Sequence, residues 1–265
     1  PMTVSIALTS GKGGVGKSNC AVNLALSLSS QGHKTVLFDT DFGMANAHIL
    51  IGANPKHTAA EFLRGDVPLS DIMVEGPLGL RFIAGGTGLL ELMNLDNQTR
   101  YKMLQSLSQL EDEIDYLIVD TPAGASDSTL FFASATDVPV IVLVAEPTSF
   151  LDAYALIKAA HIEKNINQFS VLLNMAENGP SARQNFDKFF QICTRFLDIN
   201  LHYAGMIPHS NAIRKSVVKR SPIMVSQPSS LEANAFRALT RELIQAPRNM
   251  QDGIRFFSQD MMAPK

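Results

Sequence analysis

The sequence predicts one α/β domain built on a doubly wound, mainly parallel sheet with helices on both faces. Short β-branched or apolar runs alternate with longer segments of helical periodicity. The later runs are continuously apolar, as expected of strands covered on both faces. The 265 residues are 46% hydrophobic and 18% charged, which is enough to bury a sizeable core.

Seven apolar runs are expected to form strands. They occupy residues 4–8, 35–39, 80–84, 115–120, 138–145, 169–175 and 203–208. A helix is expected at 19–32, where apolar residues recur at spacings of three and four before a glycine, and others at 150–164 and 182–197. A proline at position 247 ends a last helix from about 230, which divides the chain into a domain of residues 1–247 and a tail of residues 248–265.

Composition excludes several classes of protein. The formal net charge of −3 argues against a constitutively basic surface for nucleic acid. Cys20 and Cys193 lie far apart without a CxxC pattern, which disfavours a disulfide framework or a zinc or iron–sulfur site. The N-terminus lacks the pattern of a signal peptide, and no apolar run is long enough to span a membrane, so we expect a cytoplasmic protein.

The stretch SGKGGVGKSN at residues 10–19 carries the strongest motif. It satisfies G-x-x-x-x-G-K-[ST] between an apolar strand and an amphipathic helix, which predicts a phosphate-binding loop. Lys17 is expected to reach the β and γ phosphates, and the Ser18 hydroxyl to bind Mg²⁺. The residues expected to hold the nucleotide are Gly11, Gly13, Gly14, Val15, Gly16, Lys17, Ser18 and Asn19.

Lys12 is a second lysine that a plain phosphate loop does not need. Two desolvated ammonium groups on one set of phosphates would repel each other, so Lys12 is expected to point elsewhere. KGGVGKS resembles the deviant Walker A motif of the MinD/ParA class of P-loop NTPases. The resemblance implies an ATP-dependent homodimer in which Lys12 contacts the ATP of the other subunit. An ordinary exposed lysine on a loop is the alternative.

Two further segments place carboxylates near the phosphates. Asp39 and Asp41 close the second strand at a spacing of two, so both project to one side and would repel each other without a cation. This segment resembles the family's Walker A′, which implies that Asp41 orients the attacking water and Asp39 supports the water shell of the metal. LIVDTPAG resembles Walker B, with Asp120 holding Mg²⁺ through water. In both segments, acids that only cap a turn are the alternative.

These resemblances imply an ATPase that converts ATP to ADP and phosphate. Lys12, Lys17, Asp39 and Asp41 would be catalytic, and Ser18, Asp39 and Asp120 would hold Mg²⁺. The family also implies that Asn174 hydrogen-bonds adenine and that the loop at Pro208 packs against the ring. His209 and Ser210 follow that proline where relatives often carry an acid, which departs from the family pattern.

Several longer stretches narrow the resemblance to one branch. DTDFGMANAHILIG, DTPAG, AEPTSFLDAYALIK and a final GIRFF are similar to the FlhG family, also called FleN or YlxH. These MinD-like ATPases set flagellar number and placement in bacteria. The resemblance implies as partners the flagellar GTPase FlhF, a flagellar master transcription regulator or proteins of the flagellar switch and C-ring.

The tail predicts an amphipathic C-terminal helix. Met250, Ile254, Phe257 and Met261 fall at spacings of 4, 3 and 4, within one face of a helix. Burying these four side chains would stabilise a docked helix, but ordering about twelve residues costs a comparable free energy. Attachment is therefore expected to be marginal and reversible. The helix is expected to contact the inner membrane peripherally when ATP drives dimerisation, or to dock in a groove of its own domain. A permanently packed helix is the alternative.

Other functions are also compatible with the sequence. A ParA-type ATPase that binds nonspecific DNA would use the basic run Arg214, Lys215, Lys219 and Arg220, whose spacing is equally typical of a solvated helix face. Nucleic-acid binding is therefore disfavoured. A noncatalytic regulator that uses nucleotide only as a structural ligand is also compatible with the sequence. A metal carrier related to the family would need bridging cysteines, which the sequence lacks.

Overall fold

A computed structural model describes residues 2–41, 47–250 and 253–258 of the chain. Its strands form one eight-stranded sheet in the order β3-β4-β2-β5-β1-β6-β7-β8. The strands are β1 (Val4–Thr9), β2 (Thr35–Asp39), β3 (Met73–Glu75), β4 (Arg81–Ala84), β5 (Tyr116–Asp120), β6 (Val138–Leu143), β7 (Gln168–Ala176) and β8 (Asn200–Pro208). All pairings are parallel except that of β3 with β4, so the predicted doubly wound sheet is confirmed.

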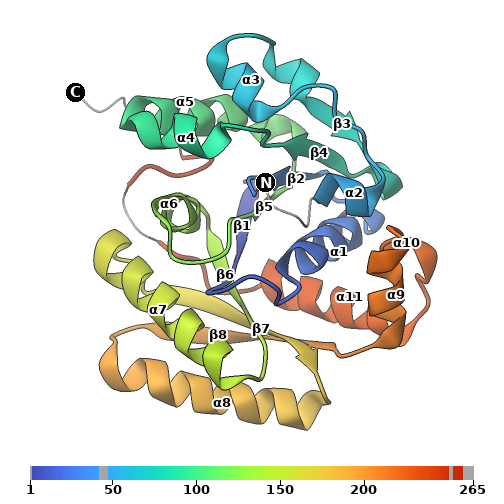
Figure 1. The fold of residues 1–265 in the computed structure, drawn as a ribbon, viewed down its shortest axis with the longest axis vertical. Coiled ribbons are helices and arrows are strands. Elements are labelled where there is room, and N and C mark those ends of the chain that lie inside the picture. The colour runs from blue at the N-terminus through green and yellow to red at the C-terminus, as the bar shows by residue number, and fades with distance from the viewer. Residues whose placement is uncertain (1, 42–46, 251–252, 259–265) are drawn as a thin grey trace.

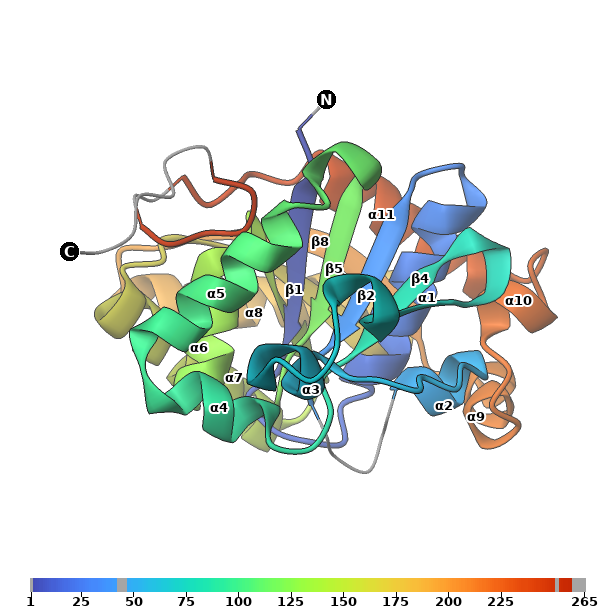
Figure 2. The same ribbon diagram turned by 90° about the horizontal axis from the view of Figure 1, so that it is seen from above.

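Helices cover both faces of this sheet, as Figures 1 and 2 show. The helices are α1 (Lys17–Ser30), α2 (Ala47–Ile51), α3 (Ala59–Arg64), α4 (Leu89–Leu95), α5 (Asn97–Ser108), α6 (Asp127–Ala135), α7 (Pro147–Lys164), α8 (Gly179–Phe196), α9 (Asn211–Val218), α10 (Ile223–Ser226) and α11 (Leu231–Ile244). Short 3-10 helices lie at Leu69–Ile72, Pro77–Gly79 and Glu111–Glu113. In the described part of the chain, no helix has the length and apolar character needed to cross a bilayer.

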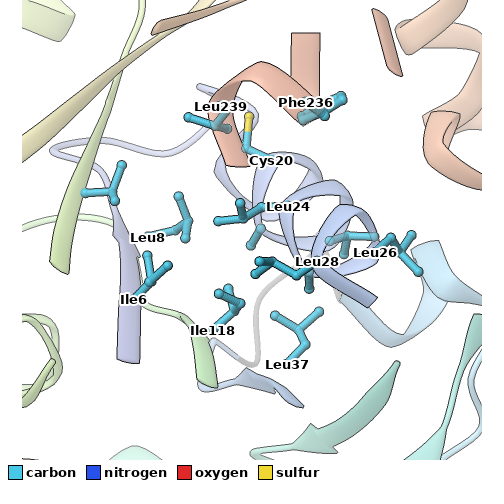
Figure 3. Close-up of a cluster of buried hydrophobic side chains, with 14 of the residues drawn as sticks. Ile6, Leu8, Cys20, Leu24, Leu26, Leu28, Leu37, Ile118, Phe236 and Leu239 are labelled. Carbon is cyan, nitrogen blue, oxygen red and sulfur yellow. The ribbon is translucent and has the colours of Figure 1, made fainter. Parts of the chain in front are cut away.

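The alternation of side chains along the strands builds two cores. Ile6 and Leu8 of β1 point to the face covered by α1 and α11, where Leu24 and Phe236 are also fully buried (Figure 3). Ala7, between them, points to the opposite face, which α3 to α8 cover. Because a two-residue repeat places every second side chain on each face, these continuous apolar runs had to be buried on both sides.

The tail differs from the predicted amphipathic helix. Within residues 253–258 the chain forms turns, and Phe257 has a positive φ of 56°, which a helix interior does not allow. Phe256 and Phe257 are both buried in the core beneath α5 and α6. The sequence pattern missed this because Phe256 lies off the apolar stripe.

Hydrogen bonds hold this segment on the domain. The guanidinium of Arg255 lies 2.7 Å from Asp137 Oδ1, and the N–H groups of Phe256 and Phe257 donate to Ala135 O (2.9 Å) and Ser108 Oγ (3.1 Å). The tail of residues 248–265 is therefore attached to the domain over its described part.

The remaining positions of the predicted stripe have different environments. Met250 is 85% exposed, and Ile254 is also exposed. Met261 lies outside the described residues. Of the stripe's described members, only Phe257 is buried, so these residues do not form one buried face.

Candidate functional site

The phosphate loop joins β1 to α1, and its path requires glycine at two positions. Gly16 caps α1 with a φ of 78°, and a Cβ there would lie 2.5 Å from Asn174 Nδ2. A Cβ on Gly11 would lie 2.2 Å from the backbone carbonyl carbon of Asp152 on α7. Asn174 Nδ2 donates to Val15 O at 2.8 Å, which ties the loop to the end of β7. The loop is therefore fixed by neighbours on both sides.

Lys17, at the first turn of α1, reaches across to the end of β5. Its buried ammonium group donates to the carboxylate of Asp120 and to the carbonyl oxygen of Thr121. The Asp120 side chain is fully buried, and its Oδ2 atom has no hydrogen-bond partner among the described residues. An unpaired buried carboxylate oxygen is costly unless a cation or donor satisfies it, so this atom is suited to a ligand.

Asp39 lies beside Asp120, because the two residues are register partners in the pairing of β2 with β5. Its carboxylate accepts hydrogen bonds from Asp41 N at 3.0 Å and Ala47 N at 3.2 Å. Burial first, and then the charge of Asp120, raise the pKa of Asp39 well above its usual range, while these hydrogen bonds and Lys17 act in the opposite direction. Two buried carboxylates next to one ammonium group favour a further cation at this edge.

Hydrogen bonds to backbone carbonyl oxygens join the segment after β5 to its neighbours. Thr40 Oγ1 donates to Asp120 O at 2.7 Å, and Thr121 Oγ1 donates to Leu8 O at 2.8 Å. Gly124 N donates to Ser10 O at 2.8 Å. These threonines were not predicted as site residues, although each directly follows a strand-ending aspartate. The segment that carries Asp120 is therefore coupled to the phosphate loop.

Lys12 does not share the partners of Lys17. Its Nζ atom lies 3.1 Å from Glu146 Oε2 and 3.1 Å from Thr148 Oγ1, at the start of α7. The Lys12 and Glu146 side chains are 30% and 62% exposed, so this pair lies at the surface. We expected Lys12 to point away from Lys17, but no sequence signal indicated Glu146 or Thr148 as its partners. The contact of Lys12 with a neighbouring subunit stays a prediction.

The predicted adenine-binding residues lie at adjacent strand ends. Asn174 is near the end of β7, and Pro208 ends β8, where it pairs with Ala176. Asn174 is buried, and its amide nitrogen is bound to Val15 O. Its observed role is thus to brace the phosphate loop, and the contact with adenine stays a prediction.

The remaining predicted positions of the loop follow the path of the backbone. Gly13 and Gly14 are exposed, Val15 and Ser18 are buried, and Asn19 is half-buried on α1. No cluster of three or more histidine, cysteine or acidic side chains could hold a metal ion by itself within the described residues. Mg²⁺ at nucleotide sites uses one or two protein carboxylates with phosphates and water, so Ser18, Asp39 and Asp120 fit this ion when phosphates are bound.

Sequence comparison identifies the family. The family model described as ParA, NUBPL iron-transfer P-loop NTPase, matches residues 2–244. The chain belongs to the ParA family of P-loop NTPases. This ParA-family chain is 37% identical to the antiactivator FleN of Pseudomonas aeruginosa, over 97% of the chain and 92% of FleN. It is 34% identical to the flagellum site-determining protein YlxH of Helicobacter pylori, over 86% and 78% of the two chains.

Solved structures show the same fold at lower identity. MinD in the MinC:MinD cell division complex of Aquifex aeolicus superposes with a TM-score of 0.77 and 23% identity, over 91% of this chain and 96% of that chain. MinD complexed with Mg-ADP from Pyrococcus horikoshii has a TM-score of 0.73 and 22% identity, over 92% and 97%. The ParA-family chain therefore has the fold of the MinD ATPases.

Proposed function

We propose that this chain is a MinD-like ATPase switch that regulates bacterial flagellar number and placement. It binds Mg²⁺ and ATP, dimerises in the ATP state and hydrolyses ATP slowly. The observation that carries the proposal is the similarity to FleN over 97% of the chain, together with Lys17, Asp39 and Asp120 assembled at one sheet edge. The similarity to YlxH, which is named a flagellum site-determining protein, supports the same role.

Lys17 changes partner when nucleotide binds. In this structure its ammonium group compensates the charge of Asp120. Bound nucleotide would draw Lys17 to the β and γ phosphates, and the Asp120 carboxylate would then be available to help hold Mg²⁺. Bound Mg²⁺ neutralises charge on the phosphates. This change of partner would link nucleotide binding at the phosphate loop to the segment after β5. Hydrogen bonds of Thr121 and Gly124 join that segment to β1 and to the loop.

Asp41 is the residue proposed to orient the attacking water. It lies two residues beyond Asp39, and its backbone N–H is held by the Asp39 carboxylate. A carboxylate at this position accepts a hydrogen bond from water and directs it toward the terminal phosphate. Asp39 itself supports the water shell of the metal. None of the motifs of the site contains an arginine that could stabilise charge in the transition state. We therefore expect slow turnover, which suits a switch.

Lys12 is proposed to contact the ATP of the other subunit. Its present pair with Glu146 is largely exposed, and such pairs are worth only about 0–1 kcal/mol. Lys12 can therefore exchange Glu146 for a phosphate group at small cost. Because the phosphate belongs to the partner, dimerisation depends on bound triphosphate.

The tail is proposed to link dimerisation to a peripheral contact with the inner membrane. Its described part is docked on the domain, so membrane binding requires Phe257 to leave the core and Arg255 to leave Asp137. A dimer carries two such tails, and two weak anchors bind a surface much more tightly than one. Docking of the tail would then oppose membrane binding in the monomer.

Two other functions receive less support. Arg214, Lys215, Lys219 and Arg220 are all exposed in the region of α9, which keeps ParA-type binding of nonspecific DNA as the second candidate. An ATP-dependent mobility shift of duplex DNA would favour that candidate. A metal-carrier function is disfavoured because Cys20 and Cys193 are both buried and cannot bridge a metal at the surface.

Size-exclusion chromatography with ADP and with ATP tests the switch. Wild type should shift from monomer to dimer with ATP, and Asp41→Ala should accumulate as a stable dimer because hydrolysis is blocked. Lys12→Ala should remain monomeric while still binding ATP. Anionic vesicles added to the same samples should co-sediment only with the dimer. An ATP-induced dimer of Lys12→Ala would overturn the proposed role of this lysine.

The flagellar role needs a separate test in cells. The wild-type gene, expressed in a bacterium that lacks its own FleN, should restore the normal number of flagella counted by electron microscopy. Lys17→Ala should fail to restore it at equal protein level. Full restoration by Lys17→Ala would contradict a nucleotide-dependent switch.

A further inference from the structure

The outer edge of β8 has no strand beside it within the described residues. β8 is last in the sheet and pairs only with β7. Asn200 N donates to Asn167 O at 2.7 Å, so the backbone of Asn200 faces β7. Backbone groups alternate between the two edges of a strand, which turns the N–H and C=O groups of Leu201 and Tyr203 outward. Such an edge is a template for another strand.

A groove of about 580 Å³ runs along this edge. Helix α8, at the lower end of the molecule in Figure 1, forms one wall, and α11 contributes the other. The lining residues that matter most are Arg183, Phe186, Phe190, His202, Tyr203 and Glu242. This groove gives an added strand room beside β8.

The wall formed by α8 is aromatic. The rings of Phe186 and Tyr203 lie 5.0 Å apart, and the Arg183 guanidinium carbon lies 5.1 Å from the Tyr203 centroid and 5.6 Å from that of Phe186. Asp187 Oδ1 lies 3.4 Å from Arg183 Nε and compensates its charge. This wall therefore favours apolar side chains of a bound segment and has no strong preference for a charge of either sign.

The opposite wall is acidic. Glu242 Oε2 lies 3.5 Å from His202 Nε2, which makes no hydrogen bond within the described residues. The Glu242 side chain is 43% exposed, and no lysine or arginine in the described ranges forms an ion pair with it. A basic side chain on an incoming strand would find a partner here.

We propose that this groove binds an extended segment of a partner protein, which adds a strand along Asn200–Tyr203. Main-chain hydrogen bonds would supply affinity, and alternate side chains specificity. Apolar residues would face Phe190 and Tyr203, and basic residues would face Glu242. The register of β8 on β7 is irregular between Tyr203 and Gly205, where Gly205 has a φ of 116°, so the added strand is short. The groove is distinct from the nucleotide site, and binding needs no ATP.

The test uses three synthetic seven-residue peptides and the full chain without nucleotide. One peptide alternates valine and lysine (TVKVKVT), the second has the same composition without alternation (VVKKTVT), and the third carries glutamate for lysine (TVEVEVT). Titrations followed by backbone NMR report both affinity and location. TVKVKVT should shift and protect the amides of Leu201 and Tyr203 and bind about tenfold more tightly than VVKKTVT.

Charge reversal supplies the decisive control. Glu242→Lys should weaken TVKVKVT by about three- to tenfold and make TVEVEVT the preferred peptide. Glu91→Lys, which changes an exposed residue of α4 and gives the same net charge, should leave all three affinities unchanged. Unaltered amides of Leu201 and Tyr203 at millimolar TVKVKVT, or equal affinities for TVKVKVT and VVKKTVT, would overturn the proposal.

Discussion

The two lysines of the phosphate loop should differ sharply in what they contribute to stability. Replacing Lys17 by methionine keeps most of its volume but leaves the fully buried Asp120 without its cation. Removing one partner of a buried ion pair costs about 3–5 kcal/mol. Lys12→Met removes only a surface pair of 30% and 62% exposed side chains, worth about 0–1 kcal/mol. The two changes remove the same charge from the same loop, so each is the control for the other.

Thermal unfolding without nucleotide measures both costs. Lys17→Met should lower the melting temperature by roughly 6–20 °C, and Lys12→Met by no more than about 4 °C, at about 2–4 °C per kcal/mol for a chain of this size. The double variant Lys17→Met/Asp120→Asn should recover much of the loss, because neither buried charge then remains alone. Equal destabilisation by the two lysine variants, or a double variant as unstable as the sum of the single variants, would refute the reasoning.

Three further predictions concern neighbouring groups. The pKa of Asp39 in the folded state lies above its usual value of 3.8, so the folded chain keeps a proton that the unfolded chain releases. The free energy of unfolding should therefore fall as pH rises from 3.8 through the raised pKa. Asp39→Asn should flatten that dependence in urea titrations, and a slope equal to that of wild type would contradict the assignment. Gly16→Ala places a methyl group 2.5 Å from Asn174 Nδ2 at a positive φ, so it should destabilise the fold by about 1–3 kcal/mol. Calorimetry should show no ATP binding by this variant, and normal affinity would contradict the prediction. Burial raises the pKa of the Cys20 and Cys193 thiols to about 12. A thiol reagent at about pH 8 should therefore label neither cysteine until urea is added. Rapid labelling of the native chain would contradict the burial of these two side chains.

The chemistry of the phosphate loop was predictable because its information is local. Gly16, Lys17 and Ser18 follow one strand and open one helix, so their positions depend on few distant residues. The continuous apolar runs likewise indicated that helices cover both faces of the sheet, which is typical of a parallel sheet. Short pieces such as β3 carry too few residues for periodicity to identify them.

Long-range packing decided the contacts that the sequence could not predict. The bond between Lys17 and Asp120 joins residues 103 positions apart, and that between Lys12 and Glu146 joins residues 134 apart. Motifs named both lysines, but only the strand order brings β1, β5 and the start of α7 together. The tail departs from the predicted helix for the same reason, since the buried rings of Phe256 and Phe257 pack in a core formed by residues distant in the chain.

By itself, therefore, the sequence determined the α/β architecture, the phosphate loop and the acidic strand ends, because each depends on residue types at short spacing. The tertiary structure decided which of these charges meet, where the tail docks and which strand is left at the edge. Those outcomes depend on strand order and side-chain packing, and the burial of a group depends on atoms that are distant in the chain.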